Sequence, residues 1–393
     1  MEKLCKTELC TGCGACAAIC PMDCITMEAD KEGFLRPAVQ AEKCIDCSRC
    51  RQVCPILTES SLPGRATVAY AAVNADEQVR FSSTSGGIFS LLCNWVLERN
   101  GVIFGAAYDN AFHVVHCLAQ EKHDLHKIRG AKYAQSRLDN TFHQVREHLK
   151  DGKYVLFSGT PCQIGGLVSF LGKDYAKLIL VDLICHGVPS PMVWQHYIDY
   201  RSARDADGKK PVSIHLRSKE TGWPGYSIRF EYPDGTVYSA PNSQDPYLRG
   251  FVRDLYLRQS CYDCHFKGRS RQSDFTLGDY WGVWSQMPEY HDGKGTSLVL
   301  IHTEKGKKLW EQISPHMRFG EAPANALADN PSALTSSALT GQREQFFARF
   351  RQEDFHTLID ALCPKPAAPA KPSVLRRSIR KIRSILKDKL SLR

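Results

Sequence analysis

Cysteines at ligand spacing are the residues of this sequence best suited to chemistry. Two runs, CTGCGACAAICP and CIDCSRCRQVCP, share the pattern C-x2-C-x2-C-x3-C-P. The short gaps let three thiolates of one loop reach three irons of a cubane cluster, while the cysteine before the proline reaches the neighbouring cluster. The pattern therefore predicts two [4Fe-4S] clusters. The ligands expected for the first are Cys10, Cys13, Cys16 and Cys54. Those expected for the second are Cys44, Cys47, Cys50 and Cys20.

A structural zinc site is the main alternative for these runs, because it also uses thiolates. Zinc sites usually combine one C-x2-C pair with a distant second pair, whereas here two tandem runs of four cysteines each end in Cys-Pro. The tandem pattern favours iron-sulfur clusters. Cys5 and Cys24 lie outside it and are expected to be small buried residues. Two neighbouring clusters carry single electrons, so a redox site or partner is expected where they end.

Four further cysteines stand at predicted turns later in the chain. The stretch FSGTPCQIGG places Cys162 between an apolar run and the start of a helix, and LICHGVPSP places Cys185 after another apolar run. CYDCHFKG supplies Cys261 and Cys264 at ligand spacing. Functional groups in open α/β sheets gather at the carboxyl ends of strands, so these thiols could meet in one site. Spacing alone leaves open a third cluster, a four-thiolate zinc site and a catalytic thiol at Cys162.

Two glycine-containing turns could bind the phosphates of a cofactor. In SSTSGGIFSLLCNWVLE, free backbone N–H groups and the dipole of the predicted helix would face an anion. The residues concerned are Thr84, Ser85, Gly86 and Gly87. In IRGAKYAQS, positive charge could complement a pyrophosphate at Arg129, Gly130 and Lys132. A capped helix and a solvated basic turn are the simpler alternatives, and the sequence has neither a G-x-G-x-x-G fingerprint nor a Walker loop.

Alternating apolar and amphipathic segments predict a small two-cluster ferredoxin module followed by an α/β body. Strands are expected at VAYAAV, VIFGAAY, KYVLFS and KLILVDLIC, and a β-hairpin insertion around the PDG of IHLRSKETGWPGYSIRFEYPDGTVYSA. The predicted divisions are the ferredoxin-type module over 1–60, a first part of the body over 63–150, a second part over 151–345, and a Pro/Ala linker with a basic tail over 364–393.

The excess charge of the chain is confined to its end. Of the net charge of +9, the segment 364–393 supplies all, with ten Lys or Arg and one acid, which leaves 41 basic and 41 acidic residues elsewhere. A neutral body argues against nucleic-acid binding, which needs a broad basic surface. The clustered C-x-x-C runs, with no recognisable signal peptide and no apolar run of roughly 18 residues, predict a cytoplasmic protein whose thiols are ligands.

The basic tail also has an amphipathic pattern. In VLRRSIRKIRSILKDKLSLR, apolar residues recur at helical steps opposite a basic face. They are Leu375, Ile379, Ile382, Leu386 and Leu390. Such a segment on a flexible linker predicts peripheral contact with the inner face of an anionic membrane or with an acidic partner. A solvated charged terminus is the alternative.

Several segments, in one order, resemble the coenzyme F420 hydrogenase/dehydrogenase beta subunit family. They are STSGGIFS, RGAKYAQS, SGTPCQIGGL, DLICHGVPSP, FVRDLYLRQSCYDCHFKG and SDFTLGDYWGV, and the resemblance extends from about residue 66 to 310. A two-cluster ferredoxin module precedes them here, as in many bacterial members. The resemblance implies a body that binds one [4Fe-4S] cluster and a flavin, usually FAD and otherwise FMN. It also implies hydride transfer between the flavin and a deazaflavin, coenzyme F420, or another hydride-carrying small molecule.

The same resemblance implies roles for the residues singled out above. It makes Cys162, Cys185, Cys261 and Cys264 the ligands of a third cluster, and it places the turns at 84–87 and 129–132 on the flavin phosphates. Asp279 and Trp281 would lie near the same site. The expected partner is a ferredoxin-like protein or a larger redox complex, and no catalytic residue is assigned. The alternatives are a non-catalytic electron-transfer subunit, for example one linked to polysaccharide biosynthesis, and a zinc-stabilised interaction module.

Overall fold

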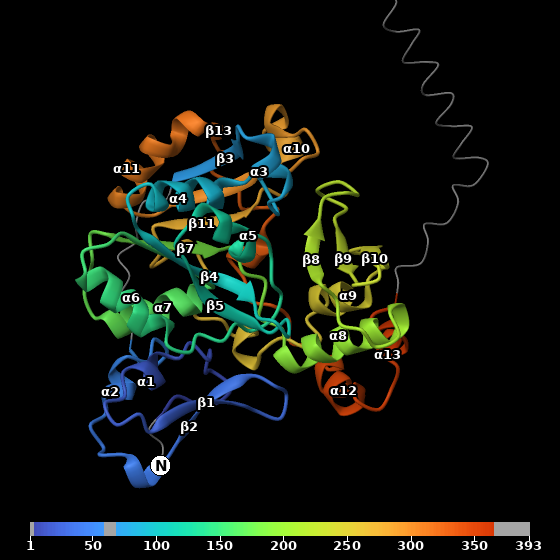
Figure 1. The fold of residues 1–393 in the computed structure, drawn as a ribbon, viewed down its shortest axis with the longest axis horizontal. Helices are drawn as coiled ribbons and strands as arrows, with labels where there is room; N and C mark the ends of the chain where they lie inside the picture. Colours follow the sequence, from blue (N-terminus) through green and yellow to red (C-terminus); the bar gives the residue numbers. More distant parts are fainter. Residues whose placement is uncertain (1–3, 59–67, 365–393) are drawn as a thin grey trace, which may run out of the picture.

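An eight-stranded mixed sheet forms the centre of the body (Figure 1). The computed structural model describes residues 4–58 and 68–364. From one edge to the other, the strands are β13 (Met317–Glu321), β3 (Val68–Asn74), β12 (Ser297–Ile301), β11 (Phe275–Asp279), β7 (Leu178–Leu183), β6 (Val155–Ser158), β4 (Val102–Tyr108) and β5 (Val114–Ala119). The strands β11, β7, β6 and β4 run parallel to one another, and the other pairings are antiparallel.

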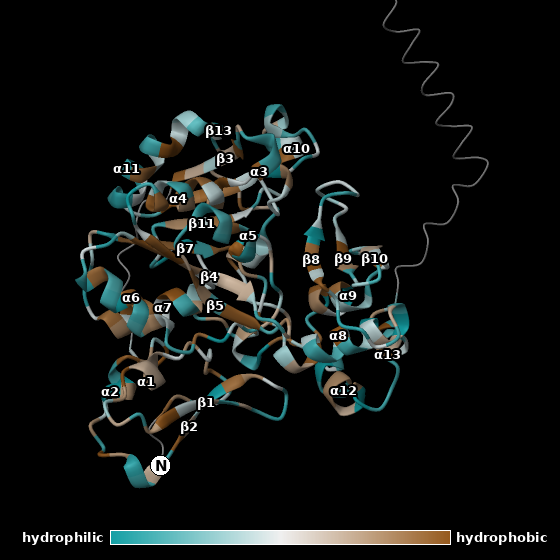
Figure 2. Cartoon of the chain, viewed as in Figure 1, coloured by the Kyte–Doolittle hydropathy of each residue, from teal (hydrophilic) through white to brown (hydrophobic). Residues whose placement is uncertain are grey.

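Helices cover both faces of this sheet, which confirms the predicted α/β class. On one face lie α4 (Ile88–Leu97), α5 (Leu125–Ile128) and α11 (Glu304–Ile313). On the other lie α6 (Thr141–Lys150) and α7 (Pro161–Leu171), and at the β3 end α10 (Val283–Gln286). The short α3 (Glu77–Phe81) follows β3. Because side chains alternate along a strand, Ile179 joins the first core and Leu180 the second. Figure 2 shows the resulting hydrophobic centre and more hydrophilic outer helices.

The strand-turn-helix predicted around Cys162 is present as β6 and α7. Thr160 caps α7 through a capping box with Gln163, and Pro161 occupies the first turn, where its missing N–H has no cost. The Thr160 N–H donates to Gln163 Oε1 at 3.0 Å. The sequence SGTPCQ therefore fixes Cys162 in the first turn of a helix that leaves the carboxyl end of a parallel strand.

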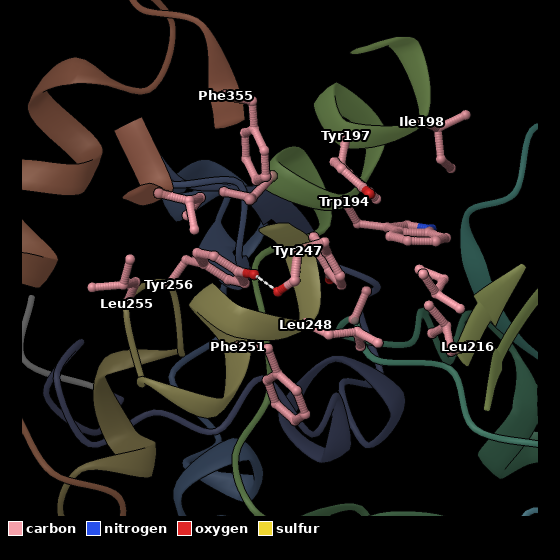
Figure 3. Close-up of a cluster of buried hydrophobic side chains, with 14 of the residues drawn as sticks. Trp194, Tyr197, Ile198, Leu216, Tyr247, Leu248, Phe251, Leu255, Tyr256 and Phe355 are labelled. Atoms are coloured by element: carbon pink, nitrogen blue, oxygen red, sulfur yellow. Dashed lines mark hydrogen bonds between the residues drawn. The ribbon is translucent and has the colours of Figure 1, made fainter. Parts of the chain in front are cut away.

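A second, outer unit stands beside the sheet and has its own aromatic core (Figures 1 and 3). Its helices are α8 (Pro191–Asp205), α9 (Pro246–Val252), α12 (Gln342–Arg349) and α13 (Phe355–Leu362). In the core, the Tyr197 and Tyr247 rings stack with centroids 5.2 Å apart, and the Tyr256 hydroxyl donates to the Tyr247 carbonyl. The core also includes Val114 of β5, and Tyr108 of β4 stacks on Trp194, so the outer unit is packed against the central sheet.

The predicted hairpin is part of a three-stranded meander in the outer unit. The strands are β8 (Ser213–Ser218), β9 (Ser227–Glu231) and β10 (Val237–Pro241), in the order β10-β9-β8. The PDG turn joins β9 to β10, with Gly235 at a φ of 84°, a conformation that glycine adopts without steric cost. The sequence prediction thus found the hairpin and missed that β8 pairs with it.

The amino-terminal module packs against both the body and the outer unit. It consists of α1 (Ala15–Ala18), β1 (Ile25–Ala29), β2 (Leu35–Val39) and α2 (Arg49–Gln52). The Leu35 N–H donates to Gln135 Oε1 at 2.7 Å. Arg343 of α12 donates from Nη1 to Glu32 Oε1 at 3.0 Å. These contacts fix the module in place.

Some predictions fall where the structure gives no description. The division between 60 and 63 and the amphipathic tail lie outside the described residues. Within 4–58 and 68–364, no helix combines the length and the apolar character needed to cross a membrane.

Candidate functional site

The eight cysteines of the two C-x2-C-x2-C-x3-C-P motifs line two small cavities. A cavity of about 20 Å³ is lined by thiols from both motifs, Cys10, Cys13, Cys16 and Cys54. A cavity of about 30 Å³ is lined by the other set, Cys20, Cys44, Cys47 and Cys50. Each motif thus lends its last cysteine to the other site. An all-thiol donor set fits an iron-sulfur cluster, and Cys47 is exposed, which brings the second site to the molecular surface.

Cys5 does not have the simple packing role expected from the sequence. It is half-buried, lines the first site, and is hydrogen-bonded to the thiols of Cys10 and Cys54. The hydrogen bond from Cys5 lowers the pKa of Cys10 to about 5 and that of Cys54 to about 6. Because Cys5 lies outside the C-x2-C pattern, sequence analysis did not predict these contacts. Cys24 is buried as expected and lies 3.3 Å, Sγ to Sγ, from Cys20.

The four later cysteines surround a third cavity of about 20 Å³. They are Cys162, Cys185, Cys261 and Cys264. Cys162 lies in the first turn of α7 and Cys185 follows β7, so the parallel strands bring them together. The Val188 N–H donates to Cys261 Sγ at 3.3 Å. Burial raises the pKa of Cys185 to about 12, an unfavourable setting for a free thiolate. A third cluster at this site stays a prediction. The four thiols would suit it as ligands.

A cavity of about 470 Å³ opens at the carboxyl ends of the parallel strands, the position at which open α/β sheets bind ligands. Its wall includes Ser158 and Thr160 after β6, Asp182 and Cys185 at β7, and Asp279 at β11. The volume lies within the range of small-molecule and cofactor sites, roughly 300 to 1,000 Å³.

The turn before α4 contributes to this cavity through most of its predicted residues. Thr84, Ser85 and Gly87 line it, and Gly87 has a φ of 85° as it begins the helix. Gly86 lies against the sheet, because a Cβ there would be 2.3 Å from the Ala72 carbonyl oxygen. Lys219 supports the turn by donating to the Ser85 carbonyl at 2.6 Å. Gly86 thus permits close packing, and its neighbours face the cavity.

The second predicted turn also lines the cavity, although its lysine is folded back. Arg129 donates from Nη1 to Ser82 Oγ at 2.8 Å, which links the two turns. Lys132 Nζ donates to the carbonyls of Lys127 and Arg129 at 2.8 Å. Burial lowers the pKa of Lys132 to about 7. The structure therefore makes Lys132 a brace of the turn, whereas Arg129 is the cation that joins it to the first turn.

The outer unit forms part of the cavity wall, which sequence analysis did not predict. Arg217 of β8 forms an ion pair with Asp279 of β11, and the Trp223 indole N–H donates to the same carboxylate at 2.8 Å. Trp223 and Trp281 stack with centroids 5.0 Å apart. The Arg217 ion pair thus joins the outer unit to the central sheet beside the cavity, and Asp279 and Trp281 line it.

Asp182 is a buried carboxylate in the wall. It accepts a hydrogen bond from the Thr276 hydroxyl, which lies 2.8 Å from His302 Nε2. Burial raises the pKa of Asp182 from 3.8 to about 6, although the positive charge of Arg271 and the hydrogen bond from Thr276 oppose the shift. The carboxyl group of Asp182 therefore holds its proton more tightly in the folded state than in the unfolded state.

The Asp182 shift predicts a pH-dependent stability. As the pH rises from about 4 to about 6, the folded state keeps a proton that the unfolded state releases, so the free energy of unfolding falls. Asp182→Asn should remove this dependence and raise the free energy of unfolding at neutral pH by roughly 2 to 3 kcal/mol. Urea unfolding of both proteins across this range measures it. Parallel profiles for the two proteins would contradict the prediction.

The cavity adjoins two of the three cysteine sites. Thr11 and Gly12 line both the first site and the cavity, and Cys185 and Arg258 line both the third site and the cavity. The thiol of Cys13 lies close to α7, since a Cβ on Gly166 would be 2.9 Å from its Sγ. The first and third sites therefore both border the cavity, and the second extends the series to the surface.

A module with two four-thiol sites, packed on an α/β body with a large cavity, defines an iron-sulfur electron-transfer protein of the oxidoreductase class. Residues 9–57 match the 4Fe-4S dicluster domain, and residues 152–325 match the carboxyl-terminal part of the coenzyme F420 hydrogenase/dehydrogenase beta subunit. The chain is thus related to the coenzyme F420 hydrogenase/dehydrogenase beta subunit through residues 152–325 and has a 4Fe-4S dicluster domain at its amino terminus, as the sequence resemblance predicted.

A solved structure gives a more distant match. A chain in the structure of the xenon-derivatised F420-reducing [NiFe] hydrogenase complex from Methanosarcina barkeri is 18% identical. The match covers 78% of this chain and 92% of that chain, with a TM-score of 0.45. No curated protein matches the sequence.

Proposed function

We propose that this chain is a flavin-dependent iron-sulfur oxidoreductase that exchanges electrons between a hydride-carrying small molecule and a redox partner protein. The observation that carries the proposal is the shared wall: one ligand-sized cavity borders two all-thiol sites. Coenzyme F420, named in the description of the family, is the first hydride carrier to test.

The residues around the cavity fit a flavin. The turn at 84–87 offers backbone N–H groups at the start of α4, and Arg129 adds positive charge beside it. These residues would hold the phosphate end of FAD or FMN. A bound flavin supplies two-electron hydride chemistry together with one-electron chemistry. The chain itself contributes the two turns that would bind the flavin. The ion pair between Arg217 and Asp279 holds the wall of the cavity together.

The partner side of the proposed pathway lies at the second cysteine site. Cys47 and the side chain of Ile45 are exposed there, the latter by 60%. A ferredoxin-like protein or a larger redox complex would exchange electrons at this surface. The basic tail, outside the described residues, would add peripheral contact with the inner face of the membrane in a cytoplasmic protein.

The function is tested by the anaerobic iron, sulfide and flavin content of the full chain. We expect about twelve irons, three clusters of four, and about one flavin per chain. Arg129→Ala should lose most of the flavin and keep the irons. Arg137→Ala, whose side chain is 47% exposed, is the matched control and should keep both. About eight irons without flavin would instead identify a non-catalytic electron-transfer subunit.

A further inference from the structure

Arg258 is a buried arginine that connects the amino-terminal module to the third cysteine site. Arg258 is only 3% exposed and stands three positions before Cys261. From Nη2 it donates to Cys162 Sγ at 3.4 Å, and the same nitrogen lies 4.0 Å from Cys261 Sγ. From Nη1 it donates to the Thr11 carbonyl, within the loop between Cys10 and Cys13. One guanidinium therefore touches two thiols of the third site and the ligand loop of the first.

The charge of Arg258 has no carboxylate to balance it. Nε donates to the Ser260 hydroxyl at 3.0 Å, and across 4–58 and 68–364 no aspartate or glutamate forms an ion pair with this side chain. A guanidinium stays protonated, and burying it without a counter-charge is costly. The groups at hand to balance it are thiolates. A cluster held by four thiolates supplies that negative charge, which explains why the sequence places an arginine here.

We propose that Arg258 is a positioning residue that raises the reduction potential of the third cluster and holds the first cluster loop against it. A fixed positive charge beside a cluster favours its reduced, more negative state, and hydrogen bonds to ligand sulfurs act in the same direction. Because the guanidinium also binds the Thr11 carbonyl, the same side chain fixes the separation of the first and third sites. The inference rests on the proposed third cluster.

The experiment is an anaerobic redox titration of the full chain, followed by the EPR signals of the clusters, with iron counted in each sample. Arg258→Gln removes the positive charge. Arg258→Lys keeps the charge but lacks the two Nη donors of the guanidinium. Arg253→Gln, on an exposed residue five positions earlier, is the matched control for loss of charge. We expect Arg258→Gln to disfavour reduction of the third cluster by tenfold or more, about 59 mV for one electron. The lysine variant should stay close to the native potential, and the control should not differ from it.

Every outcome decides the proposal. Loss of four irons in the glutamine variant alone supports it, because the lysine variant then shows that positive charge is required beside the cluster. An unchanged potential with full iron in Arg258→Gln overturns it, as does loss of the cluster in both variants. An equal shift in Arg253→Gln also overturns it, because the effect would not depend on contact. A native chain with only eight irons would refute the third cluster itself, which is a separate failure.

Discussion

Replacing Cys162 with alanine is expected to lower the iron content from about twelve to about eight per chain and to abolish the EPR signal of one cluster. Cys162 is 6% exposed and lies in a capped first helical turn, so no water or neighbouring loop can take its place easily. The first and second sites use other cysteines and should keep their clusters. Iron and sulfide analysis, together with EPR of the reduced protein, measures the effect.

The control for this variant is Cys93→Ala. Cys93 is fully buried in α4 and belongs to none of the three four-thiol sites. It therefore matches the loss of a buried thiol without the loss of a ligand, and its iron content should equal that of the native chain. Unchanged iron and EPR signals in Cys162→Ala would leave the thiol as a catalytic group or a packing residue.

Gly166→Ala is expected to disturb the contact between the body and the first cysteine site. A Cβ at this position would be 2.8 Å from Cys13 Cβ and 2.9 Å from Cys13 Sγ. A ligand held by a cluster cannot move away freely, so the overpacking should cost about 1 to 3 kcal/mol. Anaerobic urea unfolding, followed by the absorbance of the clusters, should show their loss at a lower urea concentration.

Gly341→Ala tests whether any added methyl group has this effect. Gly341 has a φ of −61°, and a Cβ there would have no atom within 4 Å. Its unfolding midpoint should not fall. Equal midpoints for Gly166→Ala and the native chain would show that the loop of Cys13 adapts to the larger residue, and that the close packing is not needed to hold the first site.

The sequence was most informative where local rules and chemistry act together. The letters SGTPCQ contain a cap, a proline for the first turn and a cysteine, and the structure has the predicted strand, turn and helix at this point. The tandem cysteine runs likewise predicted an iron-sulfur module, which the dicluster match confirms. Spacing within one short loop constrains geometry strongly, so these features could be derived without knowledge of the fold.

Features that depend on distant packing could not be derived in this way. Gly86 lies in a glycine turn, but only the position of β3 shows that it faces a carbonyl and not the cavity. Lys132 was predicted from its charge as a phosphate ligand, and the fold turns its ammonium onto backbone carbonyls. Arg258 has no motif, because its partners lie about 100 and 250 positions away. The ligand assignments for the third cluster and the flavin stay predictions.

The attachment of the amino-terminal module restricts how such chains can be recombined. Glu32 binds Arg343, Gly33 fits against Met192, and Leu35 pairs with Gln135, so one hairpin is docked on three separate parts of the protein. A ferredoxin domain grafted from another source would bring its cysteines but not these docking residues. Such a domain would assemble its own clusters but lack the contacts that hold this module against the body.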